Sequence, residues 1–244
     1  VLPKEMPSNE LKNTKFDVSE DIVIDKINMN VIVDANVKLE KLIEACNKQN
    51  LNIGYLTLNK VREKSVIEVV RANYKNLLSK RHGELKDSIL GIKFKENNRE
   101  IVYGDKLVKN VSGYNICRSN EVLNKNVEKI ALRVFNNNDN KYYKIHINSI
   151  DEKELLKINT VSYDFTPLII KKEKQSYIVF SSIYSKEELE EKDIKNVEKI
   201  EDEKEFTELN IKSKRKAKLD EIYNLSINSY IFDYQKGDVY EYGN

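Results

Sequence analysis

The 244-residue chain contains no tryptophan and only two cysteines, two histidines and seven glycines. Cys46 and Cys117 lie in different segments without a CxxC spacing, so we expect neither a disulfide framework nor a zinc site. His82 and His146 are far apart and fit no HExxH pattern, and no nucleophile-elbow motif is present. Seven glycines, with no Walker-type or GxGxxG loop, leave little material for a phosphate-binding loop.

The sequence also lacks a charge excess and any long apolar run. Forty-two Lys and Arg against 40 Asp and Glu leave a net charge of +2, which argues against a nucleic-acid binder held by a strong overall field. No run approaches the roughly 20 apolar residues of a membrane helix. The amino end, Val1-Leu2-Pro3-Lys4-Glu5, has no signal-peptide layout. We therefore expect a cytoplasmic protein, attached to a membrane at most peripherally through a complex.

What is present is enough apolar material, with 14 Tyr and 7 Phe, to fill a sizeable core. The first part of the chain is typical of strands with intervening helices. Leu39, Leu42, Ile43 and Cys46 recur on one helical face, and Ser65 with Glu68 has the spacing of a capping box. The sequence predicts strands at Phe16–Ser19, Asp21–Asp25 and Val31–Asp34, helices at Leu39–Cys46 and Ser65–Leu78, a hairpin of Ile89–Phe94 with Glu100–Gly104, and a strand at Val127–Phe135.

The polar run Asn136–Asn140 predicts a domain boundary, after which the pattern starts again. Strands alternate with helices beyond it, which indicates a small α+β domain. The expected elements are strands at Lys141–Ile147, Thr160–Phe165, Ser176–Ile183, Tyr230–Tyr234 and Val239–Tyr242, and helices at Asp151–Lys157 and Lys214–Leu225.

Two charged stretches have an ordinary structural interpretation. Lys186–Glu205 alternates in sign, which is typical of a solvated helix and its loop. Lys212–Lys218 is basic and could contact phosphate or an acidic partner, but the opposite charges nearby favour an exposed helix start.

The most informative stretch runs from Gly83 to Asn115. Gly91, inside a strand, indicates a bend or a close backbone approach, and Gly113 indicates a position where a Cβ would be in the way. Lys109 and Asn110 are polar neighbours that could fix a turn or contact an anionic ligand. On these residues alone, structural glycines and a capped turn are the simpler interpretation.

This stretch resembles the flavin-binding domain of the vanillyl-alcohol oxidase (PCMH) type. The resemblance rests on the order G-x-x-K-D-x-I-L-G at Gly83–Gly91, a hairpin ending in Tyr103-Gly104, and K-N-V-S-G-Y-N at Lys109–Asn115. The resemblance is strongest to the FAD-binding subunit of glycolate oxidase. Residues Tyr230–Gly237 also resemble the closing strand of that subunit. The similarity covers most of residues 16–135 and about the last fifteen residues.

The resemblance implies a fold and a set of partners. The expected fold is α+β, with a PCMH-type FAD-binding-like domain (a mixed sheet with flanking helices) over residues 1–135. A small α+β cap-like domain is expected over residues 136–244, with its last strand returning to the first domain. FAD is the implied cofactor, and a larger catalytic flavoprotein subunit and an iron–sulfur subunit are the implied partners. The residues matching the family's flavin-lining positions are Gly83, Lys86, Asp87, Gly91, Lys109, Asn110, Gly113 and Tyr114.

The sequence departs from this family at its phosphate-contacting glycines. The family's first subdomain, with its glycine-rich loop, has only Val1–Ser8 as a counterpart. A Ser/Thr-x-Gly-Gly turn matches Ser65–Glu68, where both glycines are replaced, and a glycine run matches Ser119–Val127, where none survives. A carboxylate at residue 68 would block and repel a diphosphate, at a cost of a few kcal/mol in a desolvated site.

These observations support three hypotheses. The favoured one is a non-catalytic or flavin-poor structural subunit of a complex that oxidises a 2-hydroxy acid such as glycolate or lactate. The second is a working FAD-binding oxidoreductase subunit, in which Tyr114 packs against the flavin ring and Asn110 donates to its polar edge. The third is a binding module without a redox role that uses Lys212–Lys218 to bind an anionic polymer.

Overall fold

The computed structural model of the chain describes residues 16, 18–57, 61–74, 76–104, 114–137, 141–149, 151–163, 167–172, 174–202, 204–207, 211–222, 229–233 and 237–242. Two compact units are present. The first comprises Val1–Tyr55, Val61–Lys75 and Gly83–Asn137, and the second comprises Leu56–Lys60, Asn76–His82 and Asn138–Asn244. The chain therefore passes from one unit to the other several times before the polar run at 136–140.

The first unit is built on a five-stranded antiparallel sheet in the order β1-β2-β6-β4-β5. Its strands are β1 (Ile22–Asp25), β2 (Asn30–Asp34), β6 (Asn126–Arg133), β4 (Ile89–Glu96) and β5 (Arg99–Gly104). The β4–β5 turn is formed by Asn97 and Asn98, both at positive φ, 50° and 59°. Positive φ at both central residues defines a two-residue hairpin turn that matches the twist of the strands. The predicted hairpin is confirmed.

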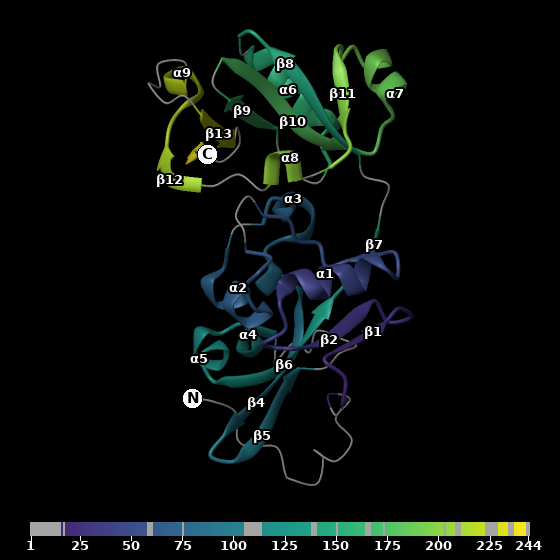
Figure 1. Cartoon of the computed structure of the whole chain (residues 1–244), viewed down its shortest axis with the longest axis vertical. Helices are drawn as coiled ribbons and strands as arrows, with labels where there is room; N and C mark the ends of the chain where they lie inside the picture. Colours follow the sequence, from purple (N-terminus) through teal and green to yellow (C-terminus); the bar gives the residue numbers. More distant parts are fainter. Residues whose placement is uncertain are drawn as a thin grey trace. The chain divides into compact units, whose positions relative to one another are not determined.

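Two helices cover one face of this sheet (Figure 1), namely α1 (Leu39–Asn47) and α2 (Val66–Ala72). Leu39, Leu42 and Cys46 of α1 are fully buried among sheet residues such as Val31 and Val33. Their spacing puts them on one side of the helix, as the sequence predicts. Short elements complete the unit: β3 (Leu51–Asn52) with β7 (Phe135–Asn136), the 3₁₀ helix η2 (Leu85–Ser88), α4 (Tyr114–Cys117) and α5 (Asn120–Leu123).

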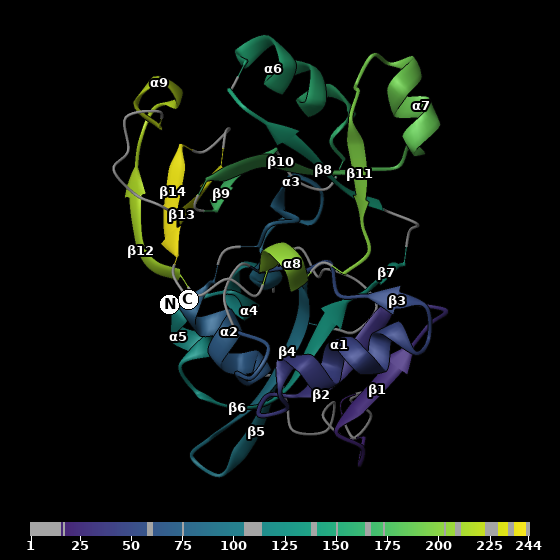
Figure 2. The same ribbon diagram turned by 45° about the horizontal axis from the view of Figure 1, so that its top comes forward.

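The second unit contains a seven-stranded antiparallel sheet in the order β11-β8-β10-β9-β13-β14-β12 (Figure 2). The strands are β8 (Lys141–Ile147), β9 (Leu168–Lys172), β10 (Gln175–Ser182), β11 (Val197–Ile200), β12 (Ile211–Lys216), β13 (Ser229–Asp233) and β14 (Asp238–Tyr242). The helices are α3 (Ser79–His82), α6 (Glu152–Val161), α7 (Lys186–Glu191), α8 (Lys204–Thr207) and α9 (Leu219–Ile222).

Both faces of the seven-stranded sheet carry an apolar cluster. Ile178 and Phe180 of β10 pack with Leu155 and Ile158 of α6 on one face. The other face holds Val179 of β10 and includes Leu56 and Leu77, which precede most of this unit in the sequence. Alternating side chains along β10 therefore supply both clusters, as a strand buried on its two faces requires.

The α+β class predicted from the sequence is confirmed, with antiparallel pairing throughout the described strands in place of a mixed sheet. The expectation that the last strand returns to the first domain is wrong. Strand β14 lies between β13 and β12 in the second sheet, where Val239 is fully buried. Its ladder hydrogen bonds are thus satisfied on both edges within the second unit.

Several predicted elements differ in the structure. The helix expected at 214–225 is wrong in its first half, because residues 211–216 form β12 and a helix begins only at Leu219. The strand expected at 160–165 is also wrong over its described residues, because α6 continues to Val161, which is buried on the same helical stripe as Ile158. The helix expected at 65–78 ends at Ala72, where Asn73 turns to φ 48°.

Two further expectations fail. The described residues of 16–19 form no strand, although Phe16 is buried at 2% exposure. The charged stretch 186–205 contains β11 as well as the expected helix, and the buried residues of β11 are Val197 and Ile200. Apolar residues at those two positions let a short strand pack where the charge pattern indicated only solvated structure.

Candidate functional site

The Gly83–Gly91 motif forms a tight local turn in the first unit. Gly83 has φ +73°, and a Cβ placed on it would lie 2.8 Å from an Asp87 carboxylate oxygen. Asp87 accepts a hydrogen bond from the Glu84 N–H at 2.9 Å, which anchors the start of η2. The structure thus brings Gly83 and Asp87 together. Glycine is favoured at residue 83 because L side chains rarely adopt its positive φ, and a Cβ would also push the Asp87 carboxylate aside.

Asp87 has a second partner that the sequence does not indicate. Arg118, at the end of α4, places its guanidinium 2.8 Å from the Asp87 carboxylate and also donates to the Asp87 main-chain oxygen. The Arg118 side chain is 13% exposed, so the pair is partly shielded from water. Beside it, the Lys86 ammonium donates to the Asn120 side-chain oxygen at 3.1 Å. The Lys86 and Asp87 side chains are therefore both engaged with residues 118–120.

Gly91 lies at a close backbone approach, as its position in a strand indicates. It pairs with Gly104 across the β4–β5 ladder, and the β4–β6 register shifts between Ile89 and Gly91. A Cβ at Gly104, where φ is +75°, would lie 2.2 Å from the Leu90 main-chain oxygen. These glycines are accounted for by the bulge and the tight strand pairing.

The remaining predicted site residues lie largely outside the description. Lys109, Asn110 and Gly113 are outside the described residues. Tyr114 begins α4, and its side chain is not described. Of the eight residues expected to line a flavin, the structure brings together Gly83, Lys86 and Asp87, with Gly91 nearby in sequence on β4.

The amino end of α2 is where the family's diphosphate-contacting turn matches this sequence. Glu68 accepts hydrogen bonds from the Ser65 N–H at 2.8 Å and from the Ser65 hydroxyl at 2.7 Å. The Glu68 N–H in turn donates to the Ser65 hydroxyl at 3.4 Å. The predicted capping box is confirmed, and these hydrogen bonds lower the pKa of Glu68. The Glu68 carboxylate therefore holds the two Ser65 donors, and the Val66 and Ile67 N–H groups donate to the Val37 and Ala35 main-chain oxygens at 2.9 and 3.0 Å. The donors at the amino end of α2 are thus occupied by the chain itself.

The physical reason why the amino end of α2 is closed to an anion differs from the sequence-based expectation. Glu68 is exposed, so solvent screens its charge, and the repulsion expected in a desolvated site does not apply. Two obstacles to a diphosphate remain. The donors at the amino end of α2 are occupied, and the two glycines of the family turn are replaced by Ile67 and Glu68, whose Cβ atoms prevent a close backbone approach. At Ser119–Val127, where the family has a glycine run, the Ser119 hydroxyl caps α5 by accepting a hydrogen bond from the Val122 N–H at 3.3 Å. The described residues at both positions therefore do not fit an FAD diphosphate.

Nucleophilic and titratable groups elsewhere are structural. Burial raises the pKa of the Cys46 thiol to about 12 and that of the Cys117 thiol to about 11, so neither forms a reactive thiolate. Desolvation, with a contribution from Arg81, lowers the pKa of His82 to about 4, which keeps its imidazole neutral. Among the described residues, no cluster of His, Cys, Asp and Glu could hold a metal ion, and no helix is long and apolar enough to span a membrane.

The basic stretch at 212–218 lies on the outer strand β12. Lys214 and Lys216 both reach Asp238 of β14, at 3.2 and 2.7 Å, and the Asp238 side chain is 5% exposed. The two ammonium groups thus compensate a buried carboxylate. Ion pairing within the sheet leaves this stretch less positive than its sequence indicates.

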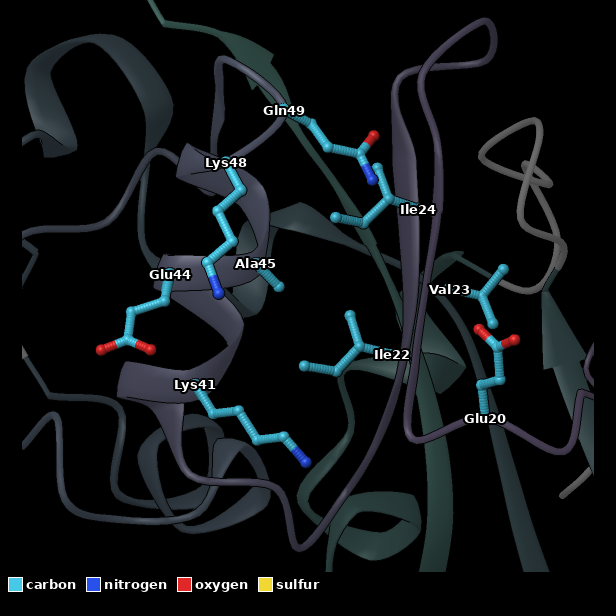
Figure 3. Close-up of a pocket in the computed structure, with 9 residues that line it drawn as sticks. All are labelled: Glu20, Ile22, Val23, Ile24, Lys41, Glu44, Ala45, Lys48 and Gln49. Atoms are coloured by element: carbon cyan, nitrogen blue, oxygen red, sulfur yellow. The ribbon is translucent and has the colours of Figure 1, made fainter.

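A groove that the sequence analysis missed lies between α1 and β1 (Figure 3). Its volume is about 470 Å³. Ile22 and Ile24 from the strand and Ala45 from the helix face its interior, and Lys41 and Lys48 extend toward it. The alternation of apolar Ile22 and Ile24 in β1 was the available signal. The sequence does not indicate, however, that β1 is the outer strand of the described sheet.

Comparison with known proteins gives a likeness in structure alone, since neither a protein-family model nor a curated protein matches this sequence. The chain is similar to an alkyldihydroxyacetonephosphate synthase, with a TM-score of 0.57 and 11% identity over 74% of this chain and 41% of that one. It is also similar to BBE-like 1 of Physcomitrella patens, with a TM-score of 0.51 and 15% identity over 71% of this chain and 39% of that one.

The chain thus spans about two fifths of the length of these structures, 41% and 39%. Both neighbours contain PCMH-type FAD-binding domains, so the fold of this chain is of that type, as its motifs indicate. At 11% and 15% identity the likeness shows the fold alone.

Proposed function

We propose that this chain is a flavin-poor, non-catalytic structural subunit of a flavin-dependent oxidoreductase complex that acts on a 2-hydroxy acid such as glycolate or lactate. In this role it docks on a larger flavoprotein subunit, with an iron–sulfur subunit as the further partner. The observation that carries the proposal is the Ser65–Glu68 capping box, which occupies the amino end of α2 within a PCMH-type fold. The substrate class and the partners rest on the resemblance of Gly83–Asn115 to the glycolate oxidase FAD-binding subunit.

The motif residues support a scaffold role. The Asp87 carboxylate beside Gly83 already has protein partners, because it accepts from the Glu84 N–H and pairs with the Arg118 guanidinium. Gly91 and Gly104 are explained by strand pairing. A sequence can therefore retain these positions for stability after the cofactor contacts are lost.

A second candidate is a working FAD-binding subunit, favoured by the structural likeness to FAD-binding proteins. In that case the chain holds the diphosphate by groups other than the amino end of α2. Residues 109–113, which lie outside the described residues, would then supply contacts.

One purification separates these two candidates. The chain is tagged, the native complex is isolated, and its subunits are separated under conditions that retain flavin. We expect the larger subunit to carry the flavin absorbance and the separated chain to be colourless. One FAD per separated chain would refute the structural role and establish the second candidate.

A further inference from the structure

The open side of strand β1 is the outer edge of the five-stranded sheet. The Asp34 N–H donates to the Asp21 oxygen at 2.8 Å, and Ile22 pairs with Val33 at the next step of the same register. Directly opposed residues in an antiparallel pair alternate between hydrogen-bonded and non-hydrogen-bonded positions. Val23 and Asp25 therefore bond to β2, whereas Ile22 and Ile24 direct their N–H and C=O groups outward. No described strand pairs with this outer side.

The α1–β1 groove runs along the same edge. An added strand would lie about 4.8 Å beyond β1, where its inward side chains would enter the groove between strand and helix. There they would contact Ile22, Ile24 and Ala45, the apolar residues that face the groove (Figure 3).

A second copy of this chain is a poor occupant. In the register that pairs the outward residues of the two copies with one another, Ile22 lies opposite Ile24 of the other copy. The same register puts Asp21 opposite Asp25 at both ends of the pair. Like charges directly opposed across strands are destabilising, and such charges are a common protection against edge-to-edge pairing.

The charges on α1 define what a suitable partner carries. Lys41 and Lys48 extend toward the groove, whereas Glu44 points away from it (Figure 3). Lys41 pairs with Asp21 at 3.0 Å, and Lys48 has no ion pair within the described part of the chain. Lys48 follows the last residue of α1, at the partly negative carboxyl end of the helix. An acidic side chain on the partner would pair with the Lys48 ammonium, which extends into the groove away from the helix end (Figure 3).

We propose that β1 docks an extended segment of the larger subunit by strand addition, with apolar and acidic side chains of that segment in the α1–β1 groove. This inference rests on the proposed function for the identity of the partner. Main-chain hydrogen bonds to Ile22 and Ile24 supply affinity, and the groove selects the side chains.

The first test is amide hydrogen exchange of the free chain and of the isolated complex. We expect the Ile22 and Ile24 amides to exchange at least about tenfold more slowly in the complex, because both gain a hydrogen bond. A complex that carries flavin but leaves these amides unprotected overturns the docking edge alone. A chain that purifies without a flavoprotein overturns the proposed function and this docking together, and a free chain that dimerises with these amides protected overturns the choice of partner.

Variants give a second, independent readout. Ile24→Pro removes an outward donor without touching the β1–β2 ladder, so the chain should fold and lose the complex. The matched control is Val102→Pro at an outward position of β5, the opposite edge, which should leave assembly unchanged. Lys48→Glu should weaken assembly by about two- to fivefold, as loss of an exposed ion pair does, whereas Glu44→Lys should not. Equal effects of the two members of either pair would overturn the proposal.

Discussion

Adding a single methyl group at Gly104 should lower the stability of the fold strongly. This glycine is the last residue of β5 and has φ +75°. A Cβ there would lie 2.2 Å from the Leu90 oxygen, 2.9 Å from the Gly91 Cα and 3.1 Å from the Cys117 sulfur. The two closest atoms belong to the backbone of β4, so no change of rotamer can relieve the contact.

The expected loss follows from two contributions. An L-residue in the left-handed region costs about 1–2 kcal/mol. Overpacking against backbone adds about 1–3 kcal/mol. Gly104→Ala should therefore lower the free energy of unfolding of the first unit by about 3 kcal/mol. Gly237→Ala is the matched control, because φ is +62° but its Cβ would meet only the Ala217 oxygen at 3.0 Å.

The assay is urea unfolding followed by far-ultraviolet circular dichroism and tyrosine fluorescence, since the chain has no tryptophan. The two units are fitted as separate transitions if the probes do not coincide. An unchanged m-value would show that stability and not compactness has changed. If Gly104→Ala costs no more than Gly237→Ala, the account of Gly91 and Gly104 as a steric close approach is refuted.

Three further outcomes are expected. Leu77→Ala should destabilise the second unit by about 2–4 kcal/mol, because Leu77 is buried in that unit's core, and the half-exposed Leu156→Ala should cost far less. The half-buried His82 has a pKa lowered from 6.5 to about 4, mainly by desolvation, so it stabilises the fold when neutral. Stability should therefore fall as pH drops from 6.5 toward 4, and His82→Gln should reduce that fall in urea titrations. Cys46 and Cys117 should resist alkylation at mildly alkaline pH until urea unfolds the chain, and rapid labelling of the native protein would contradict their burial.

Local features were predictable because a few neighbouring residues determine them. The Asn97-Asn98 turn tolerates positive φ without help from the rest of the fold, and the Ser65–Glu68 box needs only a three-residue spacing. The α1 stripe likewise follows from helical periodicity alone.

Features set by distant partners were not predictable. Residues 214–216 are locally helix-like, but Lys214 and Lys216 point to one side of β12 and meet Asp238 on β14. No local pattern indicates that Leu77 packs in the second unit, because its neighbours there come from strands about a hundred residues later. The domain division at residues 135–136 stays a prediction based on composition.

The candidate site shows the same division. Gly83, Asp87 and Gly91 were identified from their motif, and the structure explains all three through turn geometry and strand pairing. Arg118 was missed, because its ion pair with Asp87 joins residues 31 apart in the chain. The outer edge of β1 was missed because an open edge is a property of the whole sheet.

The central claim is that Glu68 closes the amino end of α2, where the diphosphate-contacting turn of the resembled family matches this sequence. It is tested most directly by titrating FAD into three purified chains. These are the wild type, Glu68→Gly, and Glu188→Gly, which removes the equivalent capping box of Ser185 in α7. Flavin fluorescence and co-elution measure binding. The account predicts no saturable binding to the wild type or to Glu188→Gly. It predicts weak but measurable binding only to Glu68→Gly, because this change releases the Ser65 N–H and hydroxyl while the Ile67 side chain and the Ser119 cap remain. A wild-type chain that binds one FAD, with an affinity that Glu68→Gly leaves unchanged, would contradict it.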